Sequence, residues 1–198
     1  MLPGPNQHRV KSLGLDLDNT VVDYGPSYAR LADSLKVDVE VADREHIRAQ
    51  LRRSEFDDEE WQHFQSVLYT EGLELAIPAE GVIDLLTTCC ELGLELHIVS
   101  HKTTYGPESF GARELRPPAQ DWIERHLVSR GLLDFNRVSF TESLSEKVGT
   151  IAALNLDVFV DDLPQVLEHP KWPSQTLGIQ YAPGSWRWEH NRWYADFH

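Results

Sequence analysis

Short apolar runs alternate with amphipathic stretches along most of this chain, and that alternation limits the fold more than any other feature. The runs are rich in Val, Leu, Ile or Phe, as expected for strands that helices cover on both faces. We expect strands at Ser12 to Asp18, Leu94 to Ser100, Arg137 to Thr141, Asp157 to Asp161 and Leu177 to Tyr181. Strands separated by helices form a parallel sheet, so the sequence predicts an α/β fold with three layers.

Helices are expected in the segments that separate these strands. The stretch from Glu80 to Leu92 carries its apolar side chains on one side, and Gly93 follows it. Glycine is the residue most often found just past the end of a helix, because it adopts the left-handed conformation without strain. The other helices are expected at Pro118 to Ser129, Ser145 to Leu154 and Leu163 to Glu168.

The segment between the first two predicted strands breaks this alternation. Its apolar side chains recur at helical spacing, at Tyr28, Leu31, Leu35, Ile47, Leu51, Trp61, Phe64 and Leu68. We therefore expect a core domain formed by residues 1–20 and 79–198 and a helical cap insertion formed by residues 21–78. The position of the insertion, directly after the first strand, favours a lid over a site at that strand's end, and an insertion without a role in the site is the alternative.

Two carboxylates close the first apolar run, in the sequence Asp16-Leu17-Asp18-Asn19-Thr20. Residues i and i+2 share a face of a strand, so Asp16 and Asp18 would point the same way if the strand continued through Asp18. Two such charges repel each other unless a cation neutralises them or one carboxylate keeps its proton. A hard cation such as Mg2+ fits the first solution and proton transfer in catalysis fits the second. Aspartates that cap a turn are the structural alternative.

The formal net charge of -14 argues against partners that are themselves anionic. We therefore expect no nucleic-acid partner and no membrane partner, since both would repel the chain. A small anionic substrate would need a local cation, which favours a metal. The chain has no apolar stretch of about 18 residues and no signal-peptide pattern at its start. Its cysteines, Cys89 and Cys90, are adjacent and suit reduced thiols, so we expect a cytoplasmic protein.

Polar residues follow the predicted strands at the edge where parallel sheets bind ligands. The second strand ends in Ser100, followed by His101 and Lys102, and the fourth ends in Asp161 and Asp162. Lys147 lies in the helix before the fourth strand. Carboxylates, hydroxyls and amines from separate segments are thus expected to meet at one rim. Taken one at a time, each of these residues could equally be a strand-end or solvated helix residue.

The ordered set resembles the motifs of the haloacid dehalogenase-like (HAD) superfamily over about Ser12 to Tyr181. Asp16-Leu17-Asp18-Asn19-Thr20 is similar to the first motif, Ser100 to the second, Lys147 to the third and Asp161-Asp162 to the fourth. Four motifs in the right order are far more specific than one. The resemblance implies a Rossmann-like HAD core with an inserted helical cap and a phosphatase activity that requires Mg2+.

The resemblance also implies a role for each residue. Asp16 would be the nucleophile that forms an aspartyl-phosphate, and Asp18 the acid and base, with its main-chain carbonyl on the metal. Ser100 and Lys147 would stabilise the phosphoryl group. The metal site would comprise Asp16, Asp18, Asp161 and Asp162, with one of Asp161 and Asp162 as a direct ligand and the other acting through a water molecule. Family members that displace halide lack an acid at the position of Asp18, so dehalogenation is disfavoured.

We expect Thr20, His101 and Lys102 to bind the substrate, although a loop with a few polar residues is the alternative for the last two. The substrate would be a small phosphate monoester, such as a sugar phosphate. A 5'-nucleotidase is one rival, in which Tyr24, Tyr28, Trp61 or Phe64 of the cap would stack on a base. A phosphomutase is another. The third is a non-catalytic binding subunit, in which the aromatic tail at 183–198 would dock a partner.

Overall fold

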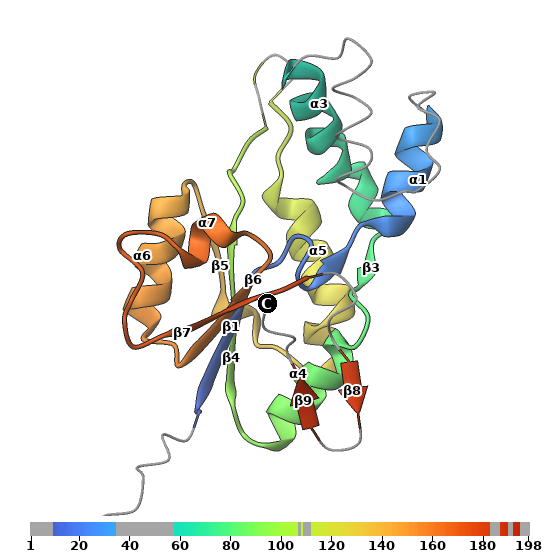
Figure 1. Ribbon diagram of the computed structural model, residues 1–198. Coiled ribbons are helices and arrows are strands. Elements are labelled where there is room, and N and C mark those ends of the chain that lie inside the picture. Colours follow the sequence, from blue (N-terminus) through green and yellow to red (C-terminus); the bar gives the residue numbers. More distant parts are fainter. Residues whose placement is uncertain are drawn as a thin grey trace, which may run out of the picture.

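Five parallel strands form the central sheet of the computed structural model, in the order β5-β4-β1-β6-β7 (Figure 1). The structure describes residues 10–34, 58–106, 108, 112–182, 187–189 and 192–194. The strands are β1 (Ser12–Leu15), β4 (Glu95–His101), β5 (Val138–Thr141), β6 (Val158–Asp161) and β7 (Leu177–Gln180). All the predicted strands are present, and the prediction of a parallel α/β sheet is confirmed.

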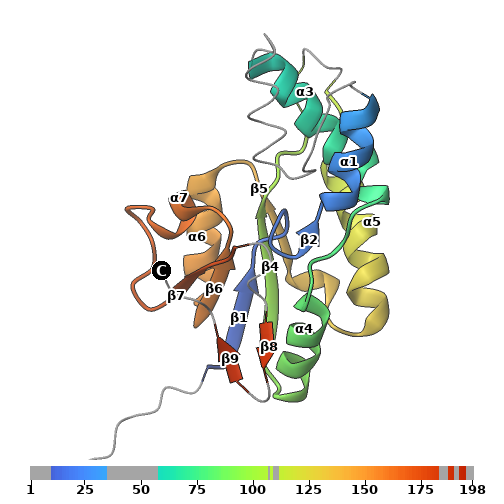
Figure 2. The same ribbon diagram turned by 45° about the vertical axis from the view of Figure 1, so that its right-hand side comes forward.

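Helices cover both faces of this sheet, as the alternation predicted. Figures 1 and 2 show α4 and α5 on one side, and α6 and α7 on the other. The bounds are α4 (Val82–Glu91), α5 (Arg116–His126), α6 (Leu144–Leu154) and α7 (Pro164–Leu167), with short 3-10 turns η3 (Val128–Arg130) and η4 (Phe135–Arg137). Each predicted helix forms within a few residues of its expected ends.

Strand β6 shows how one sheet holds two apolar cores. Val158 and Val160 belong to the cluster on the α4 and α5 side, whereas Phe159 packs with Val148 of α6 and Val166 of α7. Because successive side chains of a strand point to opposite faces, a run that is apolar at every position can fill both cores. The continuous apolar runs in the sequence follow from this burial on two sides.

Helix α4 ends as its sequence predicted. Gly93 has a φ of 72°, and its N–H donates to the carbonyl of Cys90 at 3.0 Å. The N–H of Leu94 donates to the carbonyl of Cys89 at 2.9 Å. This pair of bonds satisfies carbonyls that the helix leaves without partners. The chain is thereby turned directly into β4.

Strand β1 is shorter than predicted, because it ends at Leu15 and not at Asp18. The next residues form a tight turn, in which the N–H groups of Val21 and Val22 both donate to the carbonyl of Leu17. Asn19 adopts a φ of 62° within this turn. Asp16 and Asp18 therefore do not share a strand face, and the turn directs their carboxylates to different partners.

The inserted segment is not all helix, which corrects the prediction for its ends. Strands β2 (Val22–Asp23) and β3 (Ile77–Pro78) pair antiparallel where the segment leaves and rejoins the sheet. Between them lie α1 (Gly25–Ser34), α3 (Asp58–Leu68) and the 3-10 turn η1 (Glu71–Glu74), beyond the carboxyl ends of the sheet strands (Figure 2). The predicted apolar positions Leu35, Ile47 and Leu51 lie outside the described residues. The boundaries of the cap domain remain a prediction.

The chain's final described residues form a small hairpin. Strand β8 (Arg187–Glu189) pairs antiparallel with β9 (Arg192–Tyr194). The rest of the aromatic tail lies outside the described residues, so its contact with a partner stays a prediction. Among the residues that the structure describes, no helix is long and apolar enough to cross a membrane.

Candidate active site

The first carboxylate of the site lies where β1 and β6 end side by side. The N–H of Asp16 donates to the carbonyl of Val160 at 2.9 Å, which holds Asp16 against the neighbouring strand. Asp161 is the last residue of β6. Asp16 is 5% exposed and Asp161 is fully buried. The sheet thus brings two carboxylates together that are 145 positions apart in the chain, from 16 to 161.

Lys147 of α6 joins these two carboxylates. Its Nζ lies 2.5 Å from Oδ1 of Asp16 and 2.6 Å from Oδ2 of Asp161, and its side chain is buried. The side chain of Ser143 caps α6 by accepting from the N–H of Glu146. The cap fixes where the first turn begins, and therefore which side of the helix carries Lys147.

The electrostatics of this cluster follow from its burial. Burial raises the pKa of Asp16 to about 8, opposed by Lys147 and reinforced by Asp161, Asp18 and Asp162. Burial by itself would lower the pKa of Lys147, but Asp16 and Asp161 raise it above its ordinary value. Lys147 therefore stays protonated, whereas Asp16 needs further positive charge nearby to be ionised.

Asp16, Asp161 and Asp162 fit a divalent cation. Each offers an oxygen, and these atoms all lie within 4.8 Å of one another. When all three are ionised, Lys147 neutralises one charge and two negative charges remain. Carboxylate oxygens are the ligands that Mg2+ prefers. The side chain of Asp18, which the sequence also placed on the metal, is not in this cluster, and its main-chain carbonyl is the atom that the family resemblance implies.

Asp18 has different partners from Asp16. Its Oδ2 lies 2.9 Å and its Oδ1 3.1 Å from Nζ of Lys102, and Oδ1 also accepts from the hydroxyl of Tyr24 at 2.5 Å. The ring of Tyr69 lies under the same amine, with 4.3 Å between Nζ and the ring centroid. Lys102 was expected to meet an anion of the substrate, but here its amine is already paired with Asp18.

Two residues of the predicted set, Ser100 and Thr20, have buried hydroxyls. Ser100 and Thr20 are 1% and 0% exposed, and neither hydroxyl has a hydrogen-bond partner within the ranges that the structure describes. A buried hydroxyl without a partner costs free energy, so such groups are uncommon in native proteins. Ser100 lies near the carboxyl end of β4. Neither hydroxyl lines the open part of the pocket.

A pocket of about 270 Å3 opens over the carboxylates. Its lining residues come from the strand ends, from the loops that follow them, from helix α6 and from the insertion: Asp16, Asp18, Asn19, Gln65, Tyr69, His101, Lys102, Thr103, Leu115, Lys147, Asp162 and Leu163. Gln65 and Tyr69 are site residues that the sequence analysis missed, and Tyr24, which was expected only to stack on a base, contacts Asp18 instead. Their spacing resembles that of ordinary helical core residues, so no sequence signal separates them.

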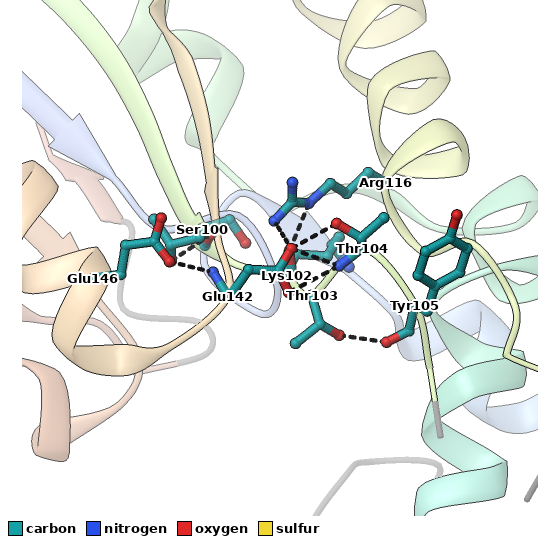
Figure 3. A network of polar contacts seen from close by, with 9 residues as sticks. Ser100, Lys102, Thr103, Thr104, Tyr105, Arg116, Glu142 and Glu146 are labelled. Atoms are coloured by element: carbon teal, nitrogen blue, oxygen red, sulfur yellow. Dashed lines mark hydrogen bonds and ion pairs between the residues drawn. The ribbon is translucent and has the colours of Figure 1, made fainter. Parts of the chain in front are cut away.

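A polar network fixes the loop that follows β4 (Figure 3). Glu142 accepts from the N–H and the hydroxyl of Thr104, and from Arg116 at 2.6 Å. The hydroxyl of Thr104 is the main cause that lowers the pKa of Glu142 below its ordinary value. Arg116 also donates from Nε to the carbonyl of Lys102 at 3.0 Å. The network ties the loop that carries Lys102 to the start of α5 and to the segment before α6.

Comparisons with known proteins show which fold the chain shares. No family model matches the chain, and no curated protein matches it. Among solved structures, a hydrolase from Streptococcus pneumoniae TIGR4 is similar with a TM-score of 0.57 and 14% identity, over 87% of this chain and 93% of that one. A haloacid dehalogenase-like family hydrolase from Streptococcus pneumoniae is similar with a TM-score of 0.51 and 18% identity, over 80% of this chain and 78% of that one.

A third similar structure shows how far the likeness reaches. Protein Tyrosine Kinase A from Mycobacterium tuberculosis has a TM-score of 0.55 and 14% identity, over 88% of each chain. Proteins with different names share this architecture, and function depends on the residues placed upon it. At the level of the fold, the resemblance that the motifs indicated is confirmed. The chain has the fold of the haloacid dehalogenase-like hydrolases.

Proposed function

We propose that this protein is a Mg2+-dependent phosphatase that hydrolyses a small phosphate monoester, such as a sugar phosphate, through an aspartyl-phosphate on Asp16. One observation carries the proposal: Lys147 bridges Asp16 and Asp161 at the floor of a pocket, with Asp162 beside them and Asp18 at its wall. Phosphoryl transfer needs a nucleophile, positive charge on the phosphoryl oxygens and a proton for the leaving oxygen. This set of groups supplies each of them.

The reaction would proceed in two steps. An oxygen of Asp16 attacks phosphorus, the bond from phosphorus to the alcohol oxygen breaks, and protonated Asp18 gives its proton to that oxygen. Water then attacks the phosphorus of the aspartyl-phosphate, and Asp18 takes a proton from the water. Inorganic phosphate leaves and Asp16 is restored as a carboxylate.

Positive charge at the floor of the pocket is needed in both steps. Lys147 would neutralise the phosphoryl oxygens and keep Asp16 ionised for attack. The hydroxyl of Ser100, which lacks another partner in the described part of the chain, is available as a donor to a phosphoryl oxygen. Asp16, Asp161 and Asp162 would hold Mg2+, which supplies charge neutralisation at the phosphoryl group when bound.

The pocket favours a compact substrate over a nucleotide. Tyr24, Tyr28 and Phe64, the aromatic residues considered for base stacking, are all buried in the apolar core. They are therefore unavailable to a base, and the side chain of Trp61 lies outside the described residues. Tyr69 does line the pocket, but Lys102 contacts its ring. A pocket of about 270 Å3 suits a compact ligand such as a sugar phosphate.

A phosphate-release assay tests this proposal. The protein should release phosphate from hexose and heptose phosphates in Mg2+, and much more slowly from mononucleotides. Faster release from mononucleotides would replace the sugar-phosphate preference by a nucleotidase. Interconversion of sugar-phosphate isomers without release would indicate a phosphomutase. If the protein turned over no phosphate ester, including an aryl phosphate, the proposed enzymatic activity would be refuted. The non-catalytic binding subunit would then be the remaining hypothesis.

A further inference from the structure

The carboxylate of Asp18 is held by more contacts than a general acid needs in order to exchange a proton with water. A carboxylate at the end of an aspartate rotates about a torsion with broad, shallow preferences. Asp18 also lies in a turn after β1 and not within a strand. Without fixed donors around it, the direction of its oxygens would be poorly defined.

Three contacts remove that freedom. Lys102 contacts both oxygens of Asp18, and the hydroxyl of Tyr24 donates to Oδ1. Oδ1 therefore has two donors and Oδ2 has one. Because each carboxylate oxygen can accept two hydrogen bonds, Oδ2 keeps the unused capacity.

Lys102 is itself held from all sides. Its side chain is 1% exposed, and its amine lies between Asp18 and the face of the Tyr69 ring. Its N–H donates to the carbonyl of Ser100, and its carbonyl accepts from Arg116. An ammonium that contacts both oxygens of Asp18 and faces an aromatic ring has little left for a substrate.

We propose that Lys102 and Tyr24 are positioning residues that hold the carboxylate of Asp18 in one orientation, leaving Oδ2 to exchange the proton with the leaving alcohol and with water. This inference rests on the proposed phosphatase activity. It replaces the expected role of Lys102 as a binder of a substrate anion. Lys102 then acts on the rate of proton transfer through Asp18, and not on the affinity for substrate.

Two substrates with different leaving groups test the inference. The leaving group of ethyl phosphate is a strongly basic alkoxide, which needs a proton as it departs. The leaving group of p-nitrophenyl phosphate is a weakly basic phenolate, which does not. The parameter kcat/KM covers the steps up to release of the alcohol, so it isolates the acid role. In Lys102→Met, kcat/KM for ethyl phosphate should fall about tenfold or more relative to that for p-nitrophenyl phosphate, because a misdirected Asp18 would lose part of the roughly 10²–10⁴-fold contribution of general acid catalysis.

Two further variants complete the experiment. Tyr24→Phe removes only one hydroxyl, and its ratio should fall in the same direction by about threefold, as one hydrogen bond would give. This variant carries the test if Lys102→Met does not fold. Lys171→Met, at an exposed lysine, removes the same charge and should leave both values of kcat/KM unchanged.

The outcomes separate the inference from the function on which it rests. Equal losses for both substrates in Lys102→Met would assign Lys102 to substrate binding and overturn the inference, as would an unchanged ratio in both variants. If the unaltered protein hydrolyses neither ester in Mg2+, the phosphatase proposal is refuted and the positioning role is refuted with it.

Discussion

Two buried lysines serve the two aspartates of one turn, and they do so from different parts of the molecule. Lys147 reaches Asp16 from α6 and also contacts Asp161 at the end of β6. Lys102 reaches Asp18 from the loop after β4, next to Tyr24 and Tyr69, which flank the helices of the insertion. We call these the Lys147 arm (Asp16, Lys147, Asp161) and the Lys102 arm (Asp18, Lys102, Tyr24, Tyr69).

Under the proposed mechanism, the two arms have separate tasks. The Lys147 arm comes from the ends of strands β1 and β6 and from helix α6, so the sheet itself supports the groups that we propose as nucleophile and metal ligands. The Lys102 arm consists of a loop and residues of the insertion, held by the network around Glu142. Changes in the insertion should therefore alter proton transfer by Asp18 and leave the attack by Asp16 intact. The predictions below test this division.

Asp16→Asn should have the largest effect. An amide can neither attack phosphorus nor bind the metal as an anion, so phosphate release should fall by at least about 10³-fold. The measurement is steady-state turnover of p-nitrophenyl phosphate in Mg2+. Asp84→Asn, at an exposed position of α4, is the matched control and should retain full activity. Activity within about tenfold of the unaltered protein would exclude Asp16 as the nucleophile.

Lys147→Met should destabilise the protein more than Lys102→Met. Loss of Lys147 leaves Asp16 and Asp161 buried without their cation, which typically costs about 3–5 kcal/mol of unfolding free energy. Asp18 keeps the hydroxyl of Tyr24 when Lys102 is lost, and it is less buried. Urea denaturation in EDTA measures both variants, and added Mg2+ should restore part of the loss for Lys147→Met. Equal losses in the two variants would contradict the division into two arms.

Mg2+ should bind more tightly as the pH rises from 6 to 8. The raised pKa of Asp16, about 8 in the absence of metal, means that its carboxyl holds a proton below that pH and must release it to bind the ion. One released proton changes the dissociation constant by at most about tenfold per pH unit. Titration calorimetry at the two pH values measures this change.

Asp16→Asn is the control for this titration, because it should bind Mg2+ weakly and lose most of the pH dependence. The same dependence in the variant would place the titrating group elsewhere.

The raised pKa of Asp16 also makes the stability of the fold depend on pH. Asp16 holds more protons folded than unfolded between its ordinary pKa and about 8, so its contribution to stability in EDTA decreases as the pH rises through that range.

Arg113→Ala should have the smallest effect. Arg113 pairs with Glu71 of η1 at 2.5 Å, and both side chains are substantially exposed. Solvent screens such pairs, so the loss of unfolding free energy should stay below about 1 kcal/mol. Urea denaturation of Arg113→Ala and Lys147→Met under the same conditions compares their losses of unfolding free energy. A loss as large as that of Lys147→Met would mean that burial does not control the strength of these pairs.

The sequence by itself determined the sheet and the membership of the Lys147 arm. Apolar runs buried on two faces predict strands, and Gly93 predicts the end of α4, because both signals are local. The motif residues Asp16, Lys147 and Asp161 could be named because a parallel sheet brings its strand ends to one edge.

Only the tertiary structure decided the Lys102 arm and the shape of the turn. Whether β1 ends at Leu15 or at Asp18 depends on the bonds that Leu17 makes with Val21 and Val22, and no pattern in the run records them. Tyr24 and Tyr69 look like helical core residues, and they contact the site because the insertion folds back over the sheet. Such contacts join residues far apart in the chain by packing, which leaves no periodic signal in the sequence.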